Sequence, residues 1–212
     1  MQQELYQIAD ELRAIANAGL RWSENGYDRE RYEQVLKVSA RLVAAAENGS
    51  FDAVYQQYTD NLAHVSPVMC VEALVYREGK ILLIQRSDDR TWAVPGGLLE
   101  VGESAARGAE RELWEEAGLR GQAVRLLALF DSRFWPANSR MQLCIAQFVM
   151  DADGDPLLHA GISETNSPLA EALDVGFFGE DELPELHRGH DQRVPKAFEL
   201  LRAGADTLYF DR

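Results

Sequence analysis

The sequence has little cysteine. Only Cys70 and Cys144 occur among its 212 residues, and each lies in an apolar run typical of a strand. Two isolated cysteines form no zinc-binding pattern, and a small cytosolic chain has little use for a disulfide. We therefore expect two reduced thiols packed in the core.

The sequence also lacks long apolar runs. A membrane-spanning helix needs roughly 20 consecutive apolar residues, and no segment approaches that length. The N-terminus, Met1-Gln2-Gln3-Glu4, carries an early acid and lacks the basic and apolar pattern of a signal peptide. We expect a cytoplasmic protein that has no membrane partner.

Basic residues are scarce relative to acidic ones. The chain has 21 Lys and Arg against 35 Asp and Glu, a formal net charge of −14. This balance disfavours binding to nucleic acid polymers or to anionic membranes. A small anionic substrate remains compatible with it, provided that a cation lies between the substrate and the protein.

Residues 1–62 are predicted to form a small all-helical domain. Apolar residues recur at helical spacing from Leu5 to Ile15, and Gly19 is placed to end this first helix. Asp28 and Ser50 can cap a second and a third helix. Because three short helices make a marginal core alone, we expect them to pack on the rest of the chain, on a second subunit, or on both.

Residues 63–212 show a different pattern, in which strands alternate with a few helices. This pattern predicts an α/β domain with a mixed sheet and helices on both faces. Gly118 is placed to end the helix that follows the Pro95-Gly96-Gly97 break. We expect strands at 68–76, 81–85, 92–97, 124–130, 141–150 and 174–178, and helices at 104–117, 180–186 and 192–202.

Three glutamates lie on one side of the predicted helix 104–117. Glu112, Glu115 and Glu116 have i, i+3, i+4 spacing, which places their carboxylates together. Like charges so placed destabilise an isolated helix by roughly 0.2–0.5 kcal/mol per pair. The simplest interpretation is a solvated acidic face. The preceding Pro-Gly-Gly break favours a second interpretation, a site for a divalent cation. Carboxylate and carbonyl oxygens are the ligands that Mg²⁺ and Mn²⁺ prefer, and a carboxylate cluster beside a backbone break can supply both.

The segment from Gly97 to Leu119 resembles the Nudix box at every fixed position. The pattern is glycine, five residues, glutamate, seven residues, Arg-Glu-aliphatic, one residue, Glu-Glu, one residue, and Gly-aliphatic. The resemblance implies a Nudix α/β/α sandwich and a Mg²⁺-dependent hydrolase, with Mn²⁺ as an alternative ion, that cuts a diphosphate linkage. Residues 5–33 are similar to the helical extension of one Nudix subgroup. That subgroup acts on nucleoside diphosphates linked to another moiety, such as ADP-ribose or CDP-choline.

The resemblance also implies roles for single residues. The helix carboxylates Glu112, Glu115 and Glu116 would bind the metal, and the backbone carbonyl of Gly96 would complete the shell. Glu103 would pair with Arg111 and fix the loop against the helix; Glu103 or Glu100 can also reach a second metal through water.

The catalytic base stays open at this point. A metal ion orients the diphosphate and lowers the pKa of a bound water, and a carboxylate must take the proton from that water. Glu115 and Glu116 are candidates. Glu164 and Glu171, in the Gly-, Ser- and Pro-containing stretch 161–171, are two others; the alternative is that they are plain loop acids.

Substrate contacts are less specific in the sequence. Arginines that follow strands can hold phosphate groups, and aromatic residues can stack on a base. The alternatives are surface arginines and packing aromatics. The candidates are Arg86, Arg133, Arg140, Trp92, Phe134 and Trp135.

Two functions of different kinds fit this chain. One is a pyrophosphohydrolase of nucleoside diphosphate derivatives, and the other is a Nudix-fold sensor that binds its ligand without turnover. A sensor can lose its glutamates, whereas all are present here. Residues 1–64 carry 6 basic and 10 acidic residues, which disfavours a DNA-reading element. We expect an enzyme with a small nucleotide derivative as its substrate, assembled as a homodimer.

Overall fold

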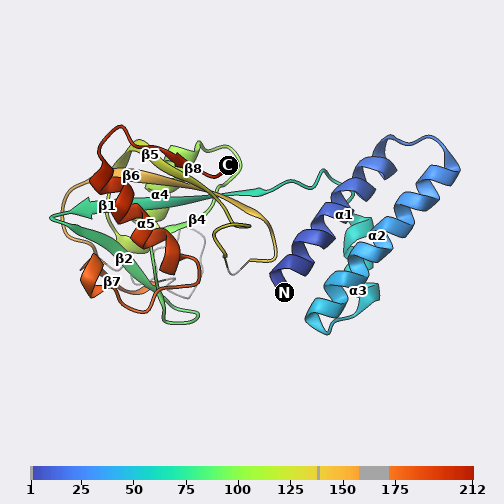
Figure 1. Ribbon diagram of the computed structural model, residues 1–212, viewed down its shortest axis with the longest axis horizontal. Coiled ribbons are helices and arrows are strands. Elements are labelled where there is room, and N and C mark those ends of the chain that lie inside the picture. Colours follow the sequence, from blue (N-terminus) through green and yellow to red (C-terminus); the bar gives the residue numbers. More distant parts are fainter. Residues whose placement is uncertain (1, 138, 158–171) are drawn as a thin grey trace. The chain divides into compact units, whose positions relative to one another are not determined.

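The computed structural model describes residues 2–137, 139–157 and 172–212 (Figure 1). The chain forms two compact units. The first contains Met1–Val68 together with Ser139–Gln142, and the second contains Met69–Asn138 and Leu143–Arg212. Each unit is described by itself.

The first unit is helical. It comprises α1 (Gln2–Trp22), α2 (Gly26–Glu47) and α3 (Phe51–Asp60), and α1 and α2 run side by side (Figure 1). Small residues at the contact let the two helix axes approach closely. The buried apolar core consists of Ala9, Ala16, Leu20, Leu36, Ala40, Val43 and Tyr58.

The prediction that Gly19 ends the first helix is wrong. Helix α1 continues to Trp22, and Gly19 lies where a Cβ atom would overlap the ring of Tyr32 on α2. The glycine therefore serves helix packing. The second helix is capped by Asn25, whose Oδ1 accepts a hydrogen bond from the backbone N–H of Tyr27 at 2.9 Å, and not by the predicted Asp28.

We predict that Gly19→Ala destabilises the protein. Alanine normally stabilises a helix interior by about 1 kcal/mol over glycine, but overpacking against Tyr32 costs about 1–3 kcal/mol. Urea denaturation of the variant measures the balance. In a Tyr32→Ala background the same change should be neutral or stabilising. A gain in stability in the wild-type background would contradict the proposed role of the glycine.

In the described part of the second unit, the strands form an eight-stranded sheet. The strand order is β3-β2-β1-β6-β5-β8, with β4 paired to β1 and β7 paired to β2. Strands β5 and β8 are parallel, whereas β1 and β2 form an antiparallel hairpin, so the sheet is mixed. The strands are β1 (Val68–Arg77), β2 (Lys80–Arg86), β3 (Trp92–Ala93), β4 (Gly96–Leu98), β5 (Gly121–Asp131), β6 (Leu143–Ala152), β7 (Ala172–Gly179) and β8 (Tyr209–Phe210).

The predicted strand at 92–97 is divided into two short strands. Pro95 lacks a backbone N–H and interrupts the ladder. Before the interruption β3 pairs with β2, and after it β4 pairs with β1. The change of partner moves Gly96 and Gly97 next to β1, where they form one wall of the candidate site.

Among the described elements, α4 (Ala105–Ala117) covers one face of the sheet and α5 (His190–Ala203) covers the other. Alternate residues of β1 point to opposite faces, so Val71 and Ala73 pack under α4, whereas Leu74 packs under α5. These layers confirm the predicted α/β/α sandwich, and Figure 1 shows α5 lying across the strands. The free thiols of Cys70 and Cys144 are partly buried, as expected.

The predicted helix at 180–186 is mostly wrong. Only Glu180–Glu182 forms a single 3₁₀ turn, and Leu186 instead bridges in parallel to Trp92. None of the helices in the described ranges is both long and apolar enough to cross a membrane.

Candidate active site

Helix α4 carries the three glutamates and has well-defined ends. The Ser104 side chain caps its N-terminus by accepting a hydrogen bond from the N–H of Arg107 at 3.3 Å. Gly118 ends the helix in the left-handed region, with φ of +63°. A Cβ atom at Gly108 would lie 2.8 Å from Leu99 Cδ1, so this glycine lets the preceding loop cross close to the helix.

The Pro-Gly-Gly break lies directly against the α4 carboxylates. The backbone N–H of Gly96 donates to Oε2 of Glu116 at 2.8 Å. A Cβ atom at Gly97 would lie 2.5 Å from Oε1 of Glu112, and one at Gly96 would overlap the carbonyl oxygen of Val71. The backbone of Val71 excludes a larger residue at Gly96, and a Cβ atom at Gly97 would displace the Glu112 carboxylate. The two glycines thus bring main-chain polar groups and carboxylates together.

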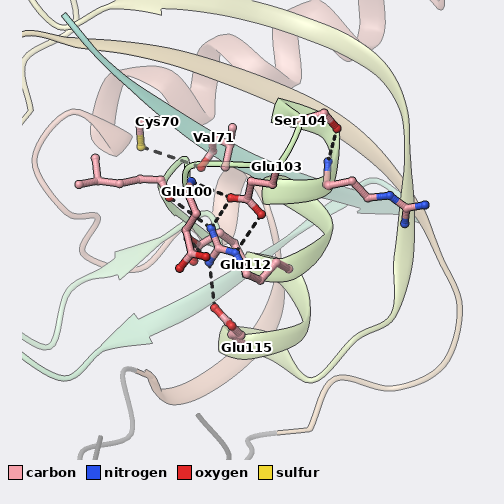
Figure 2. Close-up of polar contacts among 10 residues, drawn as sticks. Cys70, Val71, Glu100, Glu103, Ser104, Glu112 and Glu115 are labelled. Carbon is pink, nitrogen blue, oxygen red and sulfur yellow. Dashed lines mark hydrogen bonds and ion pairs between the residues drawn. The ribbon is translucent and has the colours of Figure 1, made fainter. Parts of the chain in front are cut away.

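Arg111 holds the acidic residues in one cluster. Its Nη2 and Nε donate to the two oxygens of Glu103 at 2.8 and 3.2 Å. Its Nη1 donates to Glu112 at 2.8 Å and to Glu115 at 3.0 Å, and its Nη2 also reaches the carbonyl of Leu98. Figure 2 shows Glu103 on the loop and Glu112 and Glu115 on the helix turned toward one another. The predicted ion pair between Glu103 and Arg111 is therefore present.

The cluster is strongly acidic. The guanidinium of Arg111 lowers the pKa of Glu103. Conversely, the pKa of Arg111 is raised by its carboxylate partners, mainly by Glu103 and further by Glu112 and Glu115. Three carboxylates contact one guanidinium, and Glu116 follows them on α4, so the formal charge of these five side chains is 1 − 4 = −3. Since Glu112 is only 6% exposed, solvent screens its charge weakly. Such a site attracts cations.

The donor set fits a hard divalent cation, because it consists of carboxylate and carbonyl oxygens. Within the described residues, no three Asp, Glu, His or Cys side chains are grouped as a ready-made metal site. Arg111 occupies the space between Glu112 and Glu115, and the N–H of Gly96 holds Glu116. A cation must therefore compete with Arg111 for these oxygens.

Arg86 is the predicted substrate residue with the clearest link to the cluster. It forms a two-point contact with Asp88 at 2.6 and 3.0 Å. The pKa of Arg86 is raised mainly by the hydrogen bond to Asp88, and Asp89 and Glu116 add to this effect. The structure thus shows Asp88 as the direct partner of Arg86, and Glu116 acts on it only through its charge.

The predicted aromatic contacts divide into packed and exposed side chains. Trp92 is half-buried and meets Phe178 edge to face at 4.8 Å, in the core under α5. Trp135 packs on Phe130 at 4.8 Å, and its indole N–H donates to a carboxylate near the C-terminus. Phe134 is exposed. For both tryptophans, packing accounts for the observed position.

The remaining predicted residues lie elsewhere. Arg133 pairs with Asp131 at the end of β5, and Arg140 belongs to the segment grouped with the helical unit, 2.8 Å from Oε1 of Glu47. Glu164 and Glu171 lie outside the described residues.

A buried polar cluster behind the break was not predicted. Arg193 of α5 donates to Oε1 of Glu72 at 2.7 and 3.0 Å, and Gln147 donates to Oε2 at 2.8 Å. His190 lies 3.7 Å from the same carboxylate and accepts a hydrogen bond from the N–H of Val94. The only sign of this cluster in the sequence is the presence of Glu72 and Gln147 inside otherwise apolar strands. The cluster fixes α5 to the segment that leads into Gly96.

A second unpredicted contact joins the β2–β3 loop to the turn before α5. Nδ1 of His187 lies 2.8 Å from Asp89, which also accepts hydrogen bonds from the N–H and the hydroxyl of Thr91. These contacts lower the pKa of Asp89 to about 2, against the opposing effect of burial. The loop that carries Arg86 is thereby held in place.

Comparison with known proteins agrees with this geometry. Residues 67–198 match the family model described as the NUDIX domain, which is more than half of the chain. The chain is a Nudix hydrolase. Residues 3–57 of this Nudix hydrolase match a second model, described as a UDP-X-like, N-terminal oligomerisation domain.

Two of the relatives described below match nearly the whole chain, and a third matches only part of it. A Bacillus subtilis protein described as a putative ADP-ribose pyrophosphatase is 33% identical over 209 residues, covering 96% of this chain and 95% of the relative. A solved UDP-X diphosphatase is 25% identical, covers 99% of both chains and has a TM-score of 0.59. An ADP-ribose pyrophosphatase from Streptococcus suis is 28% identical, with a TM-score of 0.55, and covers 69% of this chain and 100% of its own. The enzyme is accordingly a pyrophosphatase, and Nudix hydrolases generally use divalent metal ions.

Proposed function

We propose that this Nudix hydrolase is a Mg²⁺-dependent pyrophosphohydrolase of a nucleoside diphosphate linked to another moiety. It cleaves the diphosphate bond and releases a nucleoside monophosphate. The observation that carries the proposal is the acidic cluster at the Gly96 break, in which Arg111 holds three glutamates and the N–H of Gly96 holds Glu116. The names of the relatives favour ADP-ribose or a UDP-linked compound as the substrate class, with CDP-choline as a further candidate.

Each residue has a specific task in this proposal. Glu112, Glu115 and Glu116 would hold the metal with the carbonyl of Gly96, and Glu103 anchors Arg111 by two hydrogen bonds. When bound, the metal neutralises the diphosphate and acidifies a water molecule. Glu115 or Glu116 accepts the proton of that water; Glu164 and Glu171 are alternative bases.

Arg86 has a separate task. Its guanidinium is close enough to Glu116 for their charges to interact, and in this proposal it contacts a diphosphate oxygen at the edge of the site. Asp88 holds the guanidinium by two hydrogen bonds and so limits its freedom before the substrate binds.

A hydrolysis screen with product identification tests the function. The panel contains ADP-ribose, CDP-choline, UDP-sugars, dinucleoside polyphosphates and nucleoside triphosphates. We expect one diphosphate-linked compound to give a nucleoside monophosphate and a phosphorylated partner. Tight binding of one compound without turnover of any would favour the sensor interpretation.

Metal removal is a separate test. EDTA should abolish turnover, and Mg²⁺ or Mn²⁺ should restore it. In this proposal Glu115 is a metal ligand, and Glu115→Gln replaces its charged carboxylate by a neutral amide. The variant should therefore also weaken Mn²⁺ binding, measured by EPR without substrate. Full activity in EDTA would exclude the metal mechanism.

We also propose that the enzyme is a homodimer joined through its helical unit. The support is the family model for residues 3–57, whose description names oligomerisation. The helical unit has a small core of its own, and a unit of that size gains stability from an additional partner.

A further inference from the structure

The outer face of α1 carries three large apolar side chains. Ile8, Ile15 and Trp22 are 41%, 55% and 77% exposed. They are spaced seven residues apart, which is two helical turns, so they lie in one row along the helix. A separate side of α1, about 100° around the helix from this row, is buried against α2 through Ala9 and Ala16. We call the exposed row the α1 stripe.

A row of this kind is suited to another helix. Paired helices meet along apolar residues that recur about every 3.5 positions, and the α1 stripe supplies every second position of such a seam. Helices α4 and α5 already bury their apolar faces on the sheet. A second copy of this chain offers an identical stripe, and an isologous interface uses the same patch on both subunits. The family model for residues 3–57, described as an oligomerisation domain, spans the whole stripe.

The charges beside the stripe favour one orientation. Glu4 and Glu11 are exposed between the apolar positions in the N-terminal half, and Arg21 lies in the last turn. Parallel helices in register would place Glu11 beside Glu11 of the second copy. In an antiparallel pair centred on Ile15, the acidic half of each helix instead lies along the half that carries Arg21, and Ile8 lies opposite Trp22.

We propose that α1 packs antiparallel on α1 of a second copy along Ile8, Ile15 and Trp22. This inference rests on the homodimer proposed above and names its contact surface. Exposed tryptophan and isoleucine side chains become buried at the two-fold axis, and the tryptophans at the two ends supply the largest contact area.

Sedimentation of the full chain tests the surface. Ile15→Glu brings two carboxylates together at the axis, so we expect the dimer dissociation constant to rise by on the order of 10²-fold or more. Val38→Glu is the matched control, because Val38 is 46% exposed on α2 and lies off the stripe. Circular dichroism establishes that both variants are folded. If both variants weaken the dimer equally, or if neither weakens it, the α1 stripe is not the dimer contact.

Cysteine cross-linking tests the relative orientation of the two α1 helices. The wild-type chain is the control for cross-links through the native Cys70 and Cys144. Ile15→Cys should form a disulfide-linked dimer, and so should a mixture of Ile8→Cys with Trp22→Cys. Ile8→Cys alone should not. Cross-linking of Ile8→Cys alone would overturn the antiparallel arrangement. A monomeric wild-type chain would instead refute the homodimer itself, which separates the two failures.

Discussion

Replacing Glu116 by glutamine is expected to lower kcat by at least on the order of 10²–10³-fold, the scale for losing one key electrostatic group in an active site. Glutamine preserves the size of the side chain and can still accept the hydrogen bond from the N–H of Gly96. Its amide is a neutral and much weaker metal ligand and cannot take a proton from water. Glu115→Gln is expected to have an effect of similar size.

Glu110→Gln is the matched control on the same helix. Glu110 accepts a hydrogen bond from the N–H of Ala123 and pairs with Arg107, so its carboxylate is held by groups outside the acidic cluster. The amide oxygen can keep the contact with Ala123. We expect less than about a tenfold loss of kcat in this variant. Wild-type turnover in both Glu115→Gln and Glu116→Gln would refute the metal-site assignment.

Much of the candidate site could be predicted because its determinants are local in the sequence. The spacing of Glu112, Glu115 and Glu116 specifies one helix face. Ser104 and Gly118 mark the helix ends through capping and a left-handed backbone, which depend only on neighbouring residues. The same reasoning predicted Ser50 as the cap of α3, where its Oγ accepts from the N–H of Ala53 at 3.4 Å.

The errors arise where distant residues decide the local structure. Gly19 continues a helix because it receives the ring of Tyr32 from another helix. Residues 183–186 lose their predicted helix because the backbone of Glu185 and His187 bonds to Trp92, about 90 positions away in the chain. Local propensity is weak enough that such tertiary contacts routinely override it.

Arg111 also has more partners in the structure than the sequence pattern predicts. The motif implies a pair with Glu103, but the structure places the same guanidinium on Glu112 and Glu115 as well. A one-dimensional pattern cannot state how many partners one guanidinium shares. This sharing makes cation binding competitive with an internal ion pair.

Arg193→Met is expected to destabilise the protein by about 3–5 kcal/mol, the usual cost of removing one partner of a buried ion pair. Glu72 and Arg193 have side chains that are each 3% exposed, so the carboxylate would be left without its cation and away from water. Methionine fills a similar volume and removes little apolar packing. Urea denaturation at pH 7 measures the loss.

The pH dependence of the loss follows from the pKa of Glu72. Burial alone would raise that pKa, but the charge and the hydrogen bonds of Arg193 lower it below the ordinary value of 4.5. In the wild-type protein this pair therefore contributes stability above pH 4.5 that is lost as the pH falls. Without Arg193 burial dominates and the pKa rises, so acidification protonates Glu72 and relieves the penalty. The difference between wild type and Arg193→Met should shrink as the pH falls.

The double variant Glu72→Gln, Arg193→Met separates the charge from the packing. It removes both charges and keeps a group that can hydrogen-bond with Gln147. Nη1 of Arg193 has no hydrogen-bond partner among the described residues, so its removal also eliminates an unsatisfied donor. We expect the double variant to recover most of the stability lost in Arg193→Met, because neutral replacement of a buried pair is often tolerated. Equal destabilisation in both variants would instead mean that the arginine stabilises α5 through its shape and not through its charge.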